Sequence, residues 1–157
     1  MTSSPGVTAR AGMLVRRPVS LVFEALVDPA ITTRFWFSRG SARLDAATDV
    51  RWDWDTYSVS AQVHVLAVET NRRIQLEWAA PGGATMVQWI FTPRADDTTF
   101  VSVANWGFTG AQDEIASQAI GSTEGFALVL AGLKAFLEHG VILNLVPDRF
   151  PEGLGGS

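Results

Sequence analysis

The stretch YSVSAQVHVLAVETNRRIQLEW, residues 57–78, decides the fold of this chain. Two runs of alternating apolar residues flank the Thr70-Asn71 turn: Val59, Ala61, Val63 and Val65 before it, then Ile74, Leu76 and Trp78 after it. Alternation with a period of two is typical of antiparallel strands that bury one face. The stretch therefore predicts two neighbouring strands of a sheet with a core on one side.

The same period of two extends outward from this stretch, from Gly40 to Phe108. Turn residues separate its apolar runs, among them Thr70-Asn71 and Pro81-Gly82-Gly83. We predict six strands here, over residues 39–44, 49–55, 57–69, 73–80, 84–93 and 98–106, and a first strand over residues 7–16. A continuous up-and-down meander is the simplest topology for them.

Before these strands, helical spacing replaces alternation. Apolar residues at three-to-four spacing follow Pro18, which predicts a short helix that begins near this proline. Asp28-Pro29 ends that helix and begins a second short helical piece over residues 29–35, which leads into the aromatic cluster Phe35, Trp36 and Phe37.

After the strands, a long helix is predicted over residues 122–138. Phe126, Leu130, Leu133 and Leu137 share one of its faces, and Gly140 follows its end as a C-terminal cap. Ser122 or Thr123 is expected to cap its start. Residues 111–121 are expected to add an earlier helical segment, bent near Gly121.

Composition bounds the kind of protein. With 157 residues, of which 47% are apolar and 18% charged, the chain forms one ordinary domain rather than a disordered segment. The net charge of −4 argues against nucleic acid and acidic membranes as partners. The absence of cysteine excludes disulfides and thiolate zinc sites. No apolar run is long enough to span a bilayer, and we expect a soluble cytoplasmic protein.

The domain boundaries follow from local composition. Residues 1–5 and 151–157 are rich in Ser, Gly and Pro and are predicted to be loose ends. Residues 6–140 are predicted to form the domain. Residues 141–150 are too apolar for a free tail, so we expect this extension to pack on the domain or on a partner subunit.

Several short sequence motifs carry a family resemblance: Arg17-Pro-Val-Ser-Leu-Val-Phe-Glu-Ala-Leu26, Asp28-Pro29 with Phe35-Trp36-Phe37, Arg73-Ile-Gln-Leu-Glu-Trp78, and Gly125-Phe126 with Leu130 and Leu133. In this order they resemble the START-like (SRPBCC) superfamily, and within it the bacterial branch named after the activator of the heat-shock protein 90 ATPase. The resemblance implies an α+β helix-grip fold. In that fold a curved, antiparallel seven-stranded sheet wraps around a long C-terminal helix, and two short helices lie between strands 1 and 2.

The chain offers few residues for chemistry. His64 and His139 are its only histidines and lack metal-ligand spacing, and no serine lies in a Gly-x-Ser-x-Gly turn, so we predict no metal, no cofactor and no assignable catalytic residue. Four carboxylates are candidates for a general acid and base: Asp53, Asp55, Glu77 and Glu114. The three on strands alternate with tryptophans and are therefore expected to face solvent.

One helix cannot fill the concave face of a curved sheet, so a cavity is expected between them. The predicted ligand-binding residues are Trp36, Trp54, Trp78, Trp89, Asn105, Phe126 and Leu130. Plain core packing is the alternative role for the rings, and a bond to neighbouring backbone is the alternative role for the inward-facing Asn105.

Three functions remain open. The first is the binding of a small hydrophobic or aromatic molecule in this cavity. The second, which the resemblance permits, is a cofactor-independent cyclase or dehydratase acting on a polyketide-like substrate. The third is stimulation of a chaperone ATPase, which the family name implies. A homodimer is also expected, because the strip Phe100, Ala104 and Trp106 alternates away from the cavity and joins the apolar extension as a surface for association.

Overall fold

The computed structural model describes residues 6–80 and 83–152 and contains one seven-stranded antiparallel sheet. Its order is β1-β7-β6-β5-β4-β3-β2, so β2 to β7 form the predicted meander and β1 joins it beside β7. The strands are β1 (Ala9–Val15), β2 (Arg39–Gly40), β3 (Asp49–Trp54), β4 (Val59–Glu69), β5 (Arg73–Ala80), β6 (Gly83–Pro93) and β7 (Thr99–Trp106). The helices are α1 (Val19–Val27), α2 (Pro29–Thr32), η1 (Asp55–Tyr57), α3 (Gln112–His139) and α4 (Leu145–Arg149).

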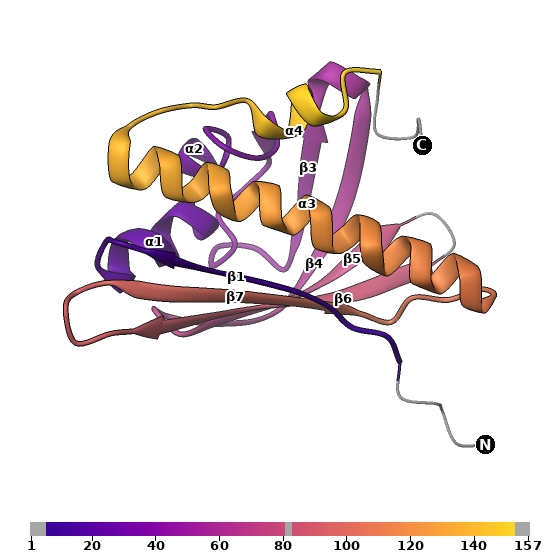
Figure 1. Cartoon of the computed structure of the whole chain (residues 1–157), viewed down its shortest axis with the longest axis horizontal. Helices are drawn as coiled ribbons and strands as arrows, with labels where there is room; N and C mark the ends of the chain where they lie inside the picture. The colour runs from indigo at the N-terminus through magenta and orange to yellow at the C-terminus, as the bar shows by residue number, and fades with distance from the viewer. Residues whose placement is uncertain (1–5, 81–82, 153–157) are drawn as a thin grey trace.

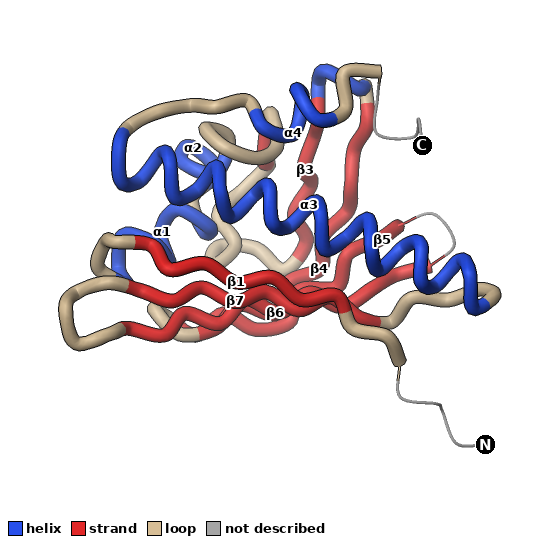
Figure 2. The backbone as a smooth tube through the Cα atoms, in the orientation of Figure 1, coloured by secondary structure: helices blue, strands red, loops and turns tan. Residues whose placement is uncertain are grey.

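The long helix α3 crosses one face of the sheet, and α1 and α2 lie near its C-terminal end (Figure 1). In Figure 1 and Figure 2, β3 and the first part of β4 turn away from the plane of β1 and β7, which makes the sheet strongly curved. The predicted α+β helix-grip fold is confirmed, including the two short helices between the first two strands.

Strand register brings the apolar positions together on the concave face. Val63 pairs with Trp78, Ile74 pairs with Trp89, and Trp89 also pairs with Val103. Directly opposed residues in an antiparallel sheet share a face, so these pairs form continuous apolar rows beneath α3. The alternation in the sequence therefore assigned the buried face of these strands correctly.

Two predicted elements are shorter in the structure. Strand β2 covers Arg39–Gly40 rather than 39–44, because Leu44 leaves the sheet: it is buried, and its amide donates to the carbonyl oxygen of Val27 at 3.1 Å. Helix α2 covers Pro29–Thr32 rather than 29–35. The predicted start is confirmed, since the Asp28 carboxylate accepts a hydrogen bond from the Ala30 amide at 2.9 Å.

The start near Ser122 and the bend near Gly121 predicted for the long helix were wrong, whereas the helical segment predicted before Gly121 is confirmed. Helix α3 begins at Gln112 and runs without interruption through Gly121, and neither Ser122 nor Thr123 is a cap. The Glu114 carboxylate instead accepts from the Ala111 amide at 3.0 Å. The first turns of α3 are mostly exposed and carry little apolar periodicity, so the apolar pattern placed the start of the long helix ten residues after its actual start at Gln112.

Hydrogen bonds join the C-terminal end of α3 to the residues that follow β1. The Arg17 guanidinium donates to the carbonyl oxygens of Leu137 and Glu138, each at 2.9 Å. The Glu138 carboxylate accepts from the Arg16 amide and from Lys134 Nζ, each at 2.7 Å. Burial acts to raise the pKa of Glu138, but these hydrogen bonds and the charge of Lys134 outweigh it and lower the pKa.

Helix α3 is long and apolar enough, by length and composition, to cross a membrane. Its apolar face is nevertheless used inside the domain, because Phe126, Leu130 and Leu133 are buried against the sheet. A core helix of this kind passes the same test of length and hydropathy, so the finding is accounted for by packing.

After Gly140, which has the left-handed φ of 67° expected of a helix end, the chain returns alongside α3 to α4 (Figure 1). Val146 on α4 is buried in the core, whereas Val141, Ile142 and Leu143 are 43–46% exposed. The predicted loose ends, residues 1–5 and 151–157, and the Pro81-Gly82-Gly83 turn lie wholly or largely outside the described residues.

Candidate functional site

Five aromatic rings, from the sheet, from α3 and from the α2–β2 connection, surround the ring of Trp36. This residue lies on the connection between α2 and β2, and its ring contacts five others. The centroid separations are 4.9 Å to Trp52, 5.5 Å to Phe37, 5.7 Å to Trp78, 5.9 Å to Trp89 and 6.0 Å to Phe126. We call these six residues, together with Trp54, the ring cluster. The ring of Trp36 thus occupies the space between the sheet and α3.

The strands hold most of the ring cluster in fixed places. Trp54 stacks on Trp78 with an interplanar angle of 9° and a centroid separation of 6.1 Å, and Phe37 stacks on Trp52 at 17° and 4.6 Å. Both arrangements are favourable for aromatic side chains. Trp52 and Trp89 are almost fully buried, while Trp36 and Trp78 keep partial exposure to solvent. The ring cluster therefore has a buried side and an accessible side.

Gly132 on α3 lets the segment that carries Trp36 approach the helix. A Cβ atom at this position would lie 3.1 Å from Phe35 Cβ and 3.3 Å from the Phe35 carbonyl oxygen. Both distances are tighter than ordinary van der Waals contact. The absence of a side chain at Gly132 is therefore what permits Phe35, and with it Trp36, to pack under α3.

Gly121 and Gly125 have a different environment. A Cβ atom built at either position meets no heavy atom within 4 Å, which indicates open space beside this part of α3. Gly121 is exposed and Gly125 is partly buried. Gly125 lies three residues after Ser122, so the open space at Gly125 lies beside the Ser122 side chain on the helix surface.

Asn105 lies near this space and has two partners. Its Nδ2 donates to the carbonyl oxygen of Met86 at 2.8 Å, and its Oδ1 accepts from the Ser122 hydroxyl at 2.7 Å. Asn105 is only 5% exposed, as its inward alternation on β7 predicts. The alternative of a bond to neighbouring backbone is thus realised in part, and Ser122 supplies the other partner.

Helix α4 packs against η1 and α3. Tyr57 Oη donates to the carbonyl oxygen of Val146 at 3.3 Å, and Arg149 pairs with Glu124 of α3 at 2.5 Å. Burial, and to a smaller extent the Asp148 carboxylate, raise the pKa of Tyr57. These contacts connect η1, α4 and the middle of α3.

The candidate acids lie away from the ring cluster. Asp53 accepts from Ser60 and Arg51, which lower its pKa, and Asp55 pairs with Arg39. Glu77 is exposed on the outer face of the sheet, as predicted, and Glu114 caps the start of α3. Within residues 6–80 and 83–152, no three His, Asp or Glu side chains are grouped to hold a metal ion.

Of the seven predicted ligand-binding residues, the structure brings Trp36, Trp54, Trp78, Trp89 and Phe126 into the ring cluster. Leu130 is fully buried on α3, and Asn105 bonds to Ser122. The predicted set did not include Trp52 and Phe37, which also belong to the ring cluster, or Ser122, the partner of Asn105. Trp52 and Phe37 were recognisable as apolar positions, but Ser122 carried no signal because its place on α3 depends on where that helix starts.

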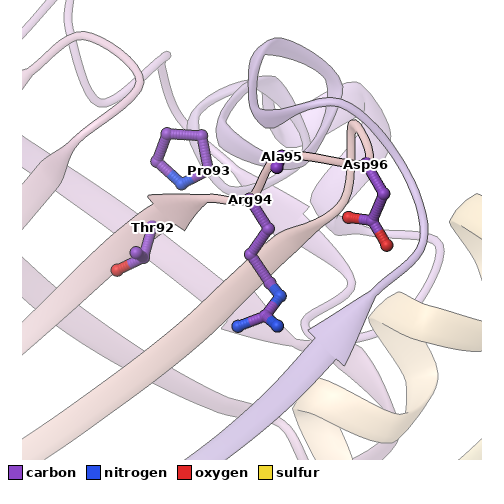
Figure 3. A pocket seen from close by; sticks show the side chains of 5 residues that line it. All are labelled: Thr92, Pro93, Arg94, Ala95 and Asp96. Atoms are coloured by element: carbon purple, nitrogen blue, oxygen red, sulfur yellow. The ribbon is translucent and has the colours of Figure 1, made fainter.

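Two open surface hollows lie elsewhere. Figure 3 shows the first, of about 490 Å³, on the β6–β7 turn, where it is lined by the exposed residues Thr92, Pro93, Arg94, Ala95 and Asp96. The second, of about 790 Å³, lies between residues 44–49 and 65–70. Neither is lined by a residue of the ring cluster. A single exposed turn also lacks the convergent walls typical of ligand sites.

Several solved structures share this fold. A protein from Staphylococcus saprophyticus, SSP2350, is 30% identical to the chain, with a TM-score of 0.74 over 87% of this chain and 96% of that one. The Aha1 dimer from Colwellia psychrerythraea is 15% identical, with a TM-score of 0.70 over 85% of this chain and 98% of that one. The di-domain ARO/CYC BexL from the BE-7585A biosynthetic pathway is 17% identical, with a TM-score of 0.73 over 84% of this chain and 46% of that one.

No protein with a curated description matches the chain. The family model described as "Activator of Hsp90 ATPase homolog 1-like protein" matches residues 16–138, which is most of the domain. That span includes the motifs from Arg17 to Leu133 that carry the resemblance to the START-like superfamily. The chain therefore belongs to the activator of Hsp90 ATPase homolog 1-like family, within the START-like (SRPBCC) superfamily.

Proposed function

We propose that this protein binds a small hydrophobic or aromatic molecule between the sheet and α3, at the ring cluster. The observation that carries the proposal is the position of Trp36. Its ring lies among five others, yet it belongs to a short connection rather than to a strand or to α3. A planar apolar molecule that took the place of this ring would contact the same aromatic faces.

Displacing Trp36 costs less than displacing a ring held by the sheet. Trp52 and Trp89 lie on strands that pair with a neighbour on each side, whereas the Trp36 amide bonds within its own segment, to the carbonyl oxygen of Thr32 at 3.0 Å. Trp36 is also partly exposed, so a route from solvent to the ring cluster exists beside it. We infer that the ligand enters on this side and displaces the Trp36 ring.

The other two functions have less support. BexL is titled an ARO/CYC protein, which keeps a cyclase or dehydratase as the second candidate, but that similarity concerns the fold alone. The candidate carboxylates of this chain bond to arginines or face solvent, so none is positioned beside the ring cluster as a general acid. Stimulation of a chaperone ATPase rests only on the family's description.

We also propose that the protein is a cytoplasmic homodimer that associates through the outer face of β1 and β7. Phe100 is 40% exposed and its ring lies over Gly12, where an added Cβ would come within 2.7 Å of Phe100 Cζ. Ala104 and Trp106 continue the same face along β7. The structure titled as the Aha1 dimer supports pairing of such domains.

Native mass spectrometry of the purified protein tests the binding proposal. We expect a mass increase from a bound small molecule, which disappears when the protein is denatured. If the protein purifies without a ligand, we expect it to take up the probe N-phenyl-1-naphthylamine. Trp36→Ala should bind this probe more tightly than wild type, because the space is already open. Trp106→Ala, which removes a partly exposed indole from the outer face, is the matched control and should bind like wild type. No bound molecule, and no uptake by wild type or Trp36→Ala, refutes the proposal.

A further inference from the structure

The Ser122–Asn105 pair has hydrogen-bonding capacity left after its own contacts. Ser122 uses its single hydroxyl hydrogen on Asn105 Oδ1, and Asn105 uses one of its two amide hydrogens on the carbonyl oxygen of Met86. A hydroxyl oxygen has two acceptor lone pairs, and an amide nitrogen has two hydrogens. One N–H donor on Asn105 and acceptor sites on Ser122 therefore remain for a third group.

That third group has room beside the pair. Gly125 is partly buried and lies three residues after Ser122 on α3, and a Cβ at this position would meet no heavy atom within 4 Å. Phe126, one turn after Ser122, contacts Trp36, Trp78 and Trp89. Residues one turn apart on a helix are neighbours, so the polar pair borders the ring cluster at Phe126.

The pair also restricts the charge of that molecule. Neither Ser122 nor Asn105 is ionisable, and Glu124, the acidic residue nearest in sequence to Ser122, pairs with Arg149. An anion placed here would lose its hydration without gaining a cation, which is costly. A hydroxyl group fits, because it donates to Ser122 Oγ and accepts from Asn105 Nδ2.

We infer that Ser122 and Asn105 together orient the ligand, and that the ligand is an uncharged aromatic molecule that carries a hydroxyl group. This inference rests on the proposed function and adds the class of molecule and the residues that select it. It assigns to Ser122, a residue of the α3 interior, a role in specificity.

Equilibrium dialysis with three probes tests the inference: 2-naphthol, 2-methylnaphthalene and 2-naphthoate. A purely apolar site favours 2-methylnaphthalene, because water solvates the hydroxyl of 2-naphthol. We expect wild type to prefer 2-naphthol and to bind 2-naphthoate most weakly. Ser122→Ala should lower the preference for 2-naphthol over 2-methylnaphthalene about tenfold, as loss of one buried hydrogen bond predicts.

Thr123→Ala is the matched control, because the Thr123 hydroxyl donates to the Ala119 carbonyl oxygen within α3. It should leave the preference unchanged. If both neutral probes bind wild type and Ser122→Ala keeps the preference, the role of the pair is refuted while the proposed function stands. If no probe binds wild type, both are refuted. If Ser122→Ala does not fold, the wild-type preference decides: tighter binding of 2-methylnaphthalene or of 2-naphthoate than of 2-naphthol overturns the inference.

Discussion

Replacing Gly125 by alanine should make the protein more stable and a poorer binder. Gly125 lies inside α3, where glycine is less favourable than alanine by about 1 kcal/mol. The added methyl group meets no heavy atom within 4 Å, so no clash opposes this gain. We therefore expect Gly125→Ala to raise the free energy of unfolding by about 1 kcal/mol, which corresponds to roughly 2–4 °C in melting temperature for a chain of this size.

Binding should change in the opposite direction. The methyl group of Gly125→Ala would project into the space beside Ser122 that the proposed ligand uses. We expect the affinity for an aromatic probe to fall about tenfold, comparable to the loss of one good contact. Gly121→Ala provides the matched control: its Cβ also meets no heavy atom within 4 Å, but the position is exposed, so it should gain stability with little loss of affinity.

Gly132→Ala should behave differently from both. Its Cβ would lie 3.1 Å from Phe35 Cβ, so the segment that carries Trp36 has to move. Overpacking of this kind costs about 1–3 kcal/mol, which exceeds the gain in helix propensity. Calorimetric melting of the three variants measures these effects. A Gly125→Ala protein that melts below wild type would show that the space beside α3 is filled, and would refute the reasoning about both stability and the site.

Three further substitutions test other parts of the structure. Trp78→Ala should lower the free energy of unfolding by about 3 kcal/mol, because Trp78 contacts four rings but keeps partial exposure. An unchanged urea denaturation curve would contradict the placement of Trp78 on the inner face of the sheet. Glu138→Gln should cost about 2 kcal/mol at pH 7 through the lost charged hydrogen bonds. Because the folded-state pKa of Glu138 is lowered, this contribution is present above the ordinary glutamate pKa and is lost as the pH falls; a wild-type advantage that persists at pH 2 would contradict the assignment. Light scattering should give wild type a mass near twice 17.0 kDa and Trp106→Lys a mass of one chain, with His64→Lys on the same sheet face remaining dimeric; a wild-type mass of 17.0 kDa excludes the dimer.

Much of the fold could be predicted from local patterns. The alternation in residues 57–78 identified β4 and β5 and their buried faces, because side chains on a strand point to opposite sides in turn. The predictions failed where packing between distant segments decides the conformation. Leu44 leaves the sheet to bond with Val27, and the exposed start of α3 lacks the apolar periodicity that marks its second half.

The candidate site shows the same division. Alternation alone predicts that the tryptophans on β3, β5 and β6 face one side of the sheet, because successive side chains on a strand point to opposite faces. By contrast, packing between distant segments places Trp36, on a connection without periodicity, in the space between those rings and Phe126. Its place depends on Gly132, almost a hundred residues later, whose missing side chain lets Phe35 approach α3. Such a contact joins segments remote in the chain, so no local pattern encodes it.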